Sequence, residues 1–265
     1  MLDKIDLLRK LSHETYDKLL PGLQRRLYDL EKACWDHKIS SIFVFEGWDG
    51  AGKGPSISSV TARLDPRGFK VHAIHPEHTM VSTRPWLWRF WQRMPNYGEM
   101  AIFDGSWYGR VLIERLEGMS SEKEWRQAYK DIVEFERLMA DDGVAIVKFW
   151  LHISKKEQKK RYKEIEDNPL ESWRVTHADW ERHKKYDEYF VAAEEMFEQT
   201  ETESGPWTVV EATSKWYARR KIFETMIAAL EHRLGSLAPP VRKGKSKDKD
   251  DAELREAMAA AEQSE

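Results

Sequence analysis

Hydrophobic residues recur along this chain in two patterns, as short apolar runs and as steps of three or four residues. The runs predict five strands, at residues 42–45, 70–74, 100–103, 144–151 and 206–210. The steps predict helices between and after them, at residues 53–64, 86–94, 122–139 and 215–234. Strands that alternate with helices in this way predict an α/β fold with a five-stranded parallel sheet flanked by helices.

Residues 1–40 precede the first strand and read as a helical extension. Apolar residues recur there at helical steps, from Tyr16 through Leu19 and Leu23 to Cys34. Pro21 lies inside this run and is a possible start for a second helix. We expect the extension to pack on the sheet or on a partner subunit. The α/β core, including the segment at about 155–190, then covers residues 41–234, and residues 235–265 form a charged tail that we expect to be disordered.

The first strand leads directly into a glycine-rich segment. Residues 47–53 fit the pattern G-x-x-x-x-G-K of a phosphate-binding loop. Glycines let successive backbone N–H groups face one anion, and the following helix adds the positive end of its dipole. We therefore expect phosphate to be bound by Lys53 and by the glycines Gly47, Gly50, Gly52 and Gly54. A glycine-rich turn without a ligand is the alternative.

Two acids are candidates for a metal at this loop. The residue after Lys53 is Gly54, which lacks the hydroxyl that usually contacts magnesium, so Asp49 within the loop is the obvious substitute. The third strand ends in Asp104, and ligands of open α/β sheets lie outside the carboxyl ends of strands. We predict that Asp49 and Asp104 bind Mg²⁺, with Mn²⁺ as a second possibility. The alternative for Asp104 is a helix cap.

Basic residues cluster in two further places. Residues 86–94 combine tryptophans with Arg89 and Arg93, which share one helix face and are candidates for an anion. The aromatic residues there are typical of a core rather than of a stacking platform. Residues 155–190 carry lysines and arginines, including Arg174 and Arg182, and we interpret them as a lid over the phosphates. A solvated surface helix is the alternative.

The composition limits the partners. The formal net charge is −3, so bulk charge gives no reason to expect nucleic acid as a partner. The single cysteine, Cys34, excludes an internal disulfide and fits a cytoplasmic setting. No run of residues approaches the length of a membrane span, so we expect no membrane partner. Aromatic residues on the N-terminal helices favour a homo-oligomer.

Together these motifs resemble the type 2 polyphosphate kinases. The matching segments are residues 45–54, 102–110 and 148–154, supported by residues 87–91, 111–118, 205–207 and 217–219. The resemblance covers about residues 15–233 and is nearest to the branch that phosphorylates nucleoside monophosphates. It implies a thymidylate-kinase-like P-loop fold with a helical lid. It also implies phosphoryl transfer between inorganic polyphosphate and a nucleoside mono- or diphosphate, with magnesium.

The resemblance also assigns roles to individual residues. It places Asp49, Lys53, Asp104 and Arg110 on functional positions, and Arg174 on a basic position of the lid. We expect Arg110, Arg115 and Arg174 to neutralise charge on the transferred group. In three places the sequence departs from the family pattern. Gly105 and His183 stand where arginine is common, although Arg182 adjoins His183, and Met80 and Val81 stand where acids are common.

Three functions are therefore open. The first is a polyphosphate-dependent nucleotide phosphotransferase. The second is an ATP-dependent nucleoside or nucleotide kinase on the same fold. The third is a phosphate-binding protein that has lost turnover, for which the absence of an arginine at Gly105 is the main support. The choice between AMP and ADP as acceptor stays open at this point.

Overall fold

The computed structural model describes residues 1–75 and 84–241 of the chain. Within these residues five strands form one parallel sheet in the order β2-β3-β1-β4-β5. The strands are β1 (Ser41–Gly47), β2 (Phe69–Ala73), β3 (Met100–Asp104), β4 (Ala145–His152) and β5 (Trp207–Glu211). The predicted α/β fold class, with its five-stranded parallel sheet, is confirmed.

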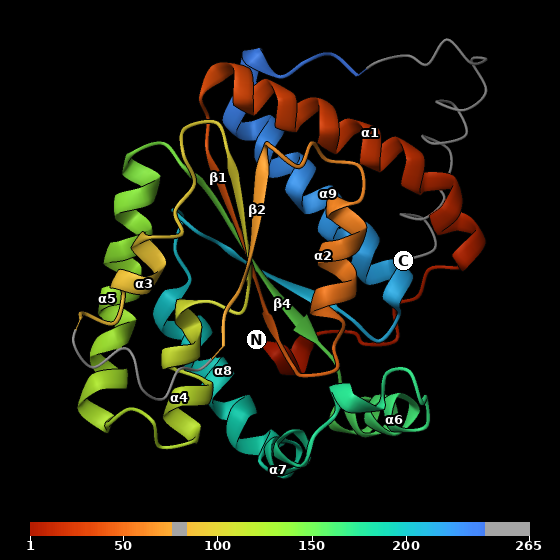
Figure 1. Ribbon diagram of the computed structural model, residues 1–265, viewed down its shortest axis with the longest axis vertical. Coiled ribbons are helices and arrows are strands. Elements are labelled where there is room, and N and C mark those ends of the chain that lie inside the picture. The colour runs from red at the N-terminus through yellow and green to blue at the C-terminus, as the bar shows by residue number, and fades with distance from the viewer. Residues whose placement is uncertain (76–83, 242–265) are drawn as a thin grey trace.

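Helices cover both faces of the sheet (Figure 1). Helices α1, α2 and α9 lie on one face, α5 and α8 lie on the other, and α6 and α7 lie beyond the carboxyl ends of the strands. Their bounds are α1 (His13–His37), α2 (Lys53–Thr61), α3 (Trp88–Trp91), α4 (Ile113–Leu116), α5 (Glu122–Asp141), α6 (Lys155–Glu166), α7 (His177–Lys184), α8 (Tyr186–Thr200) and α9 (Lys215–Leu234).

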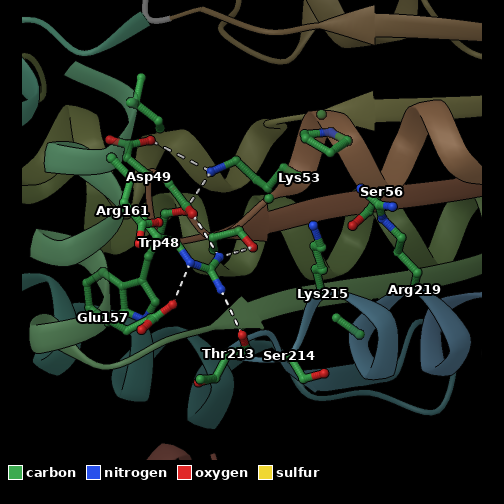
Figure 2. A pocket seen from close by; sticks show the side chains of 18 of the residues that line it. Trp48, Asp49, Lys53, Ser56, Glu157, Arg161, Thr213, Ser214, Lys215 and Arg219 are labelled. Atoms are coloured by element: carbon green, nitrogen blue, oxygen red, sulfur yellow. Dashed lines mark hydrogen bonds and ion pairs between the residues drawn. The ribbon is translucent and has the colours of Figure 1, made fainter. Parts of the chain in front are cut away.

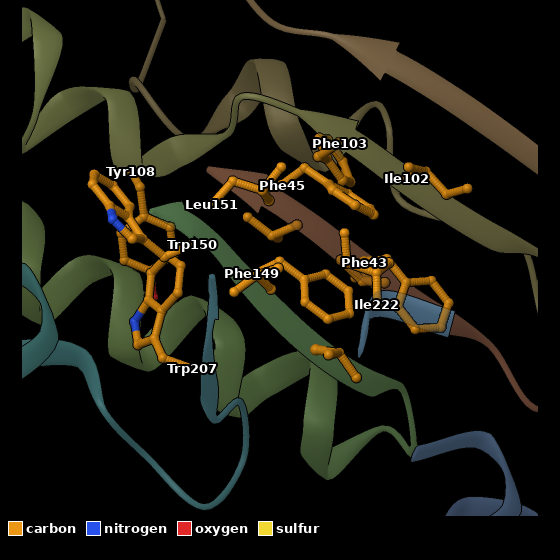
Figure 3. Packing of buried hydrophobic residues seen from close by; sticks show 14 of the residues in the cluster. Phe43, Phe45, Ile102, Phe103, Tyr108, Phe149, Trp150, Leu151, Trp207 and Ile222 are labelled. Atoms are coloured by element: carbon orange, nitrogen blue, oxygen red, sulfur yellow. The ribbon is translucent and has the colours of Figure 1, made fainter. Parts of the chain in front are cut away.

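The two central strands are buried on both sides, as their apolar runs predict. Residues 41–46 of β1 and 146–152 of β4 are all buried. Aromatic rings fill the space between sheet and helices, among them Phe43, Phe45 and Phe149 (Figure 3). The N-terminal helix belongs to this same cluster, because Leu19, Leu23, Leu27 and Leu30 of α1 are part of it. The N-terminal extension therefore packs on the body of the protein.

Three local predictions need correction. Helix α1 runs through Pro21 without a new start. Pro21 costs the helix a hydrogen bond, but the buried leucines before and after it keep one stripe against the core. The expected helix at 86–94 is only the single turn α3, and α8 was not predicted at all. The tail after residue 241, together with Met80 and Val81, lies outside the described residues.

None of the helices in the described ranges combines the length and the apolar character that crossing a membrane requires.

A charged pair lies at the centre of the core. The side chain of Lys148 on β4 is fully buried, and its Nζ donates to Glu136 Oε2 at 2.8 Å, to the Tyr108 hydroxyl at 2.8 Å and to the Thr200 carbonyl at 2.9 Å. Glu136 Oε1 in turn accepts from Trp107 Nε1 at 2.9 Å and from Tyr108 at 2.8 Å. All three ammonium protons are therefore bound, and the pair anchors the segment that follows Asp104.

Breaking this network should lower the stability of the protein strongly, and a second substitution should restore part of the loss. Lys148→Met leaves a buried carboxylate without its cation, and we expect it to lower the free energy of unfolding by about 3–5 kcal/mol. The double variant Lys148→Met/Glu136→Gln removes the stranded charge and should recover about 1 kcal/mol or more of this loss. Urea unfolding monitored by circular dichroism measures both. A single variant that loses less than about 1 kcal/mol contradicts the network.

Candidate functional site

The candidate site lies at the edge of the sheet where all strands end. In a parallel sheet the carboxyl ends of the strands share one edge, and ligands bind outside it. Here β1 lies between β3 and β4, and its residues Phe45 and Gly47 pair with Asp104 and Leu151. The loop after β1 therefore emerges between the ends of two neighbouring strands, with Asp104 beside it.

The loop at residues 47–53 curls tightly between the end of β1 and the start of α2. Gly47, with φ of +130°, lies so close to β4 that an added Cβ would be 2.4 Å from the Leu151 carbonyl oxygen, which only glycine permits. Gly52 precedes α2, so Lys53 is the first residue of that helix. Lys53 Nζ donates to the carbonyl oxygen of Gly47 at 2.8 Å and of Trp48 at 3.3 Å. Its ammonium group therefore lies inside the curve of the loop.

A cavity of about 900 Å³ opens in front of this loop (Figure 2). The loop, the lid and the start of α9 enclose it, and Lys53 and Asp104 both line it. The predicted residues that line it are Asp49, Gly50, Gly52, Lys53, Gly54, Asp104 and Arg174. The structure thus brings together the two acids, the loop lysine and one lid arginine, as the sequence predicts.

A third acid, Glu46, lies close to Lys53 and Asp104 at this edge of the sheet. Glu46, the residue before Gly47, is buried and accepts a hydrogen bond from the Ser106 hydroxyl at 2.7 Å. Burial raises the pKa of Glu46 to about 7, and the nearby Asp104 carboxylate adds to this rise, although Lys53 and Ser106 oppose it. Glu46 was not predicted, because an acid inside an apolar strand gives no separate sequence signal.

The lid is joined to the loop through Asp49. Arg182 Nε, on α7, donates to Asp49 Oδ2 at 2.9 Å, and the same guanidinium pairs with Asp179 and lies 3.6 Å from Glu117 Oε1. Asp49 Oδ1 is 3.7 Å from Lys53 Nζ. His183, where the family commonly has arginine, is buried and its Nδ1 hydrogen bonds to Gln158 Oε1 at 2.7 Å. Arg182 is thus the lid arginine that reaches the loop.

The other predicted arginines lie elsewhere. Arg89 and Arg110 converge on Glu114, with nitrogen–oxygen distances of 2.8 and 3.1 Å. Arg115 pairs with Glu195 at 2.7 Å and lies over the Trp125 ring. None of these three lines the cavity at the loop. Arg174 does, and its guanidinium is 2.7 Å from Glu171.

Four cations of the cavity were missed as site residues. Lys10, Lys215 and Arg219 line it, and among the described residues no carboxylate pairs with them. Arg161 also lines it and comes from the basic run that is typical of a solvated helix. A signal was present, since Lys215 and Arg219 begin the helix after the fifth strand, where ligands of a parallel sheet bind.

The chain also resembles known proteins. A family model described as polyphosphate kinase 2 matches residues 10–236. A polyphosphate:AMP phosphotransferase of Pseudomonas syringae pv. tomato is 42% identical over 233 residues, which are 87% of this chain and 46% of the relative. An AMP/ADP-polyphosphate phosphotransferase of Meiothermus ruber is 35% identical over 215 residues, which are 80% of each chain.

Solved structures agree with the sequence comparisons. The crystal structure of polyphosphate kinase 2 from Arthrobacter aurescens TC1 superposes with a TM-score of 0.84 at 30% identity, over 96% of this chain and 92% of that one. The chain spans about half the length of the polyphosphate:AMP phosphotransferases that it matches. The loop geometry, the family match and the shared fold agree, and the chain belongs to the polyphosphate kinase 2 family.

Proposed function

We propose that this protein transfers a phosphoryl group between inorganic polyphosphate and a nucleoside mono- or diphosphate. The observation that carries the proposal is the set of cations in the cavity at Lys53. Lys10, Lys215 and Arg219 add positive charge to it without carboxylate partners among the described residues. A polyphosphate donor carries negative charge along its whole length and requires cations along the cavity. An ATP donor ends in an uncharged base, which does not require them.

The residues present fit a magnesium ion. Within the described residues no three His, Cys, Asp or Glu side chains form a ready-made metal site. Mg²⁺ binds proteins through one or two carboxylates and completes its shell with water and substrate phosphates. Asp49 and Asp104, which line one cavity, match this pattern. Bound there, the ion would supply positive charge that neutralises the phosphates. Mn²⁺ has the same oxygen preference.

The protein groups then have separate tasks. Lys53 and the loop amides hold the phosphates at the reacting centre, and Lys215 and Arg219 hold the rest of the donor chain. The acceptor would bind on the β3 side of Asp104, where Arg89, Arg110 and Glu114 gather. Phosphoryl transfer depends on positioned charge rather than on a protein nucleophile, so no covalent phosphoenzyme is needed.

One observation favours the rival function of binding without turnover. Gly105 follows Asp104 directly, with φ of +74°, and an added Cβ would lie 3.1 Å from the Ile74 carbonyl oxygen. L-residues rarely adopt this backbone conformation. The turn is therefore built for glycine, and an arginine there requires a different turn. Another side chain has to supply the cation that the family pattern places at this position. Without such a side chain, turnover is slow.

We also expect a homo-oligomer in a cytoplasmic setting. Tyr28 and Trp35 on α1 are 38% and 41% exposed, and the single cysteine, Cys34, is buried and free. Exposed aromatic side chains are enriched where proteins associate. We expect neither nucleic acid nor a membrane as partner.

The choice of phosphoryl donor tests the proposed function. Purified protein with AMP, Mg²⁺ and polyphosphate should form ADP, and EDTA should abolish the reaction because the two carboxylates repel the phosphates when no cation is present. The same assay uses ADP and the mono- and diphosphates of the other bases. Product formed only with ATP as donor would establish an ATP-dependent kinase. Binding of polyphosphate without transfer to any acceptor would establish a protein that has lost turnover.

The loop lysine tests the site. Lys53→Ala should lower kcat by at least about a thousandfold, because the transition state loses a positioned charge. The protein should still fold, since the side chain lines the cavity and is not part of the hydrophobic core, and circular dichroism checks this. Lys163→Ala, an exposed lysine on α6, is the control and should keep full activity. A fully active Lys53→Ala enzyme contradicts the assignment of the loop.

The glycine after Asp104 tests the backbone argument. Gly105→Ala should lower the free energy of unfolding by about 1–2 kcal/mol, because alanine is strained at positive φ. Gly54→Ala is the matched control, since an added Cβ there meets nothing within 4 Å and the residue is helical. We expect this control to be neutral or stabilising by up to about 1 kcal/mol. Chemical denaturation measures both, and equal effects would show that the turn after Asp104 relaxes.

A further inference from the structure

The backbone carbonyls of the phosphate-binding loop need partners of their own. A loop whose N–H groups face an anion directs carbonyl oxygens away from it, and buried carbonyls require donors. Three consecutive carbonyls of this loop receive donors from α6. Gln158 Nε2 donates to the Asp49 carbonyl at 3.0 Å, and Arg161 Nη1 donates to those of Gly50 and Ala51 at 3.0 and 3.1 Å.

Arg161 also binds a second loop. Its Nη2 donates to the carbonyl oxygens of Ala212 and Thr213, at 2.7 and 3.1 Å. These residues connect β5 to α9, and Lys215 follows two positions later as the first residue of that helix. Figure 2 shows the guanidinium between the phosphate-binding loop and Thr213. One side chain therefore joins the loop that holds Lys53 to the segment that presents Lys215 and Arg219.

The guanidinium has no proton left for a phosphate. Its fifth N–H, on Nε, donates to Glu157 Oε1 at 2.9 Å, and an arginine side chain has five N–H donors in all. The side chain is 17% exposed. By contrast, Lys215 and Arg219 line the same cavity without a carboxylate partner among the described residues. Arg161 thus holds two loops of the cavity in position, whereas Lys215 and Arg219 supply positive charge that no carboxylate pairs with among the described residues.

We infer that Arg161 is a positioning residue that clamps the phosphate-binding loop to the start of α9. It thereby sets the spacing between Lys53, at the transferred phosphate, and Lys215 and Arg219, on the remaining donor chain. The identity of the donor rests on the proposed function, whereas the clamp itself does not. A shift of the loop against α9 keeps every cation in the cavity but changes the distance from Lys53 to Lys215 and Arg219, which moves the reacting phosphate out of line.

The split between kcat and KM distinguishes a clamp from a phosphate ligand. Arg161→Lys keeps the charge but cannot reach four carbonyls, so kcat should fall at least about tenfold while the KM for polyphosphate changes less than about threefold. Lys215→Met should show the reverse, with KM raised about fivefold to tenfold and kcat nearly unchanged. Lys163→Met, an exposed lysine of α6, should match the wild type. An Arg161→Lys enzyme with unchanged kcat overturns the inference, whether or not KM rises.

Hydrogen exchange tests the clamp without turnover. In the wild-type protein the amides of residues 47–54 and 212–216 should open with a common free energy, because one side chain holds both segments. In Arg161→Lys both segments should exchange faster, while in Lys215→Met neither should. Independent protection of the two segments in the wild type would refute the clamp. If no acceptor is phosphorylated from polyphosphate, the proposed function fails and this measurement alone decides the inference.

Discussion

The parallel register of the sheet is the constraint on which the site depends. Phe45 pairs with Asp104, and Gly47 pairs with Leu151, so the last residues of three strands meet at one edge. Residues 42–45 of β1 and, apart from Lys148, residues 146–151 of β4 are apolar and buried, which fixes these strands inside the molecule. Because the core fixes the strands, the groups that follow them are fixed as well. The acid of β3 and the loop of β1 are brought together by burial of residues that never touch a substrate.

Charge in the cavity is divided between two kinds of side chain. Two of the arginines that line it are paired with acids, Arg161 with Glu157 and Arg174 with Glu171, and Arg182 of α7 pairs with Asp49, which also lines it. Lys215 and Arg219, at the start of α9, have no such partner among the described residues. A guanidinium has a rigid fork of donors suited to joining backbone segments, whereas an ammonium group is a point charge. Most of the arginines thus build the cavity, and the unpaired cations at its α9 side are free for an anion.

The sequence predicts the five strands and the glycine-rich loop between β1 and α2, because apolar runs and glycine spacing are local signals. It predicts Asp104 because an acid at the end of a buried strand has a defined place in a parallel sheet. It does not predict the role of Arg161, which looks like one more cation in a basic helix. Its direction depends on Gln158 and Tyr162, which share the buried face of α6. The direction of that face can be inferred only when the position of the loop against which it packs is known.

The arginines after Asp104 show the same limit. Arg110 and Arg115 lie five residues apart, and the spacing alone gives them equal claims to the site. In the structure Arg110 shares Glu114 with Arg89, whereas Arg115 bonds to Glu195 of α8, a helix that was not predicted. A partner on an unpredicted element cannot be inferred from periodicity.

The loop is also held from the side of the lid. The ring of Trp48 stacks on Tyr186, the first residue of α8, with centroids 3.9 Å apart, and its Nε1 donates to His152 Nδ1 at 2.9 Å. Burial lowers the pKa of His152 to about 4, so the ring stays neutral and can accept this bond at physiological pH. With α6 on the carbonyl side, the loop is supported from two directions before any ligand arrives. Such a preformed arrangement of donors is what stabilises developing charge in phosphoryl transfer. Under the proposed function, Gly105 leaves this supported loop without the cation that the family pattern commonly places beside it.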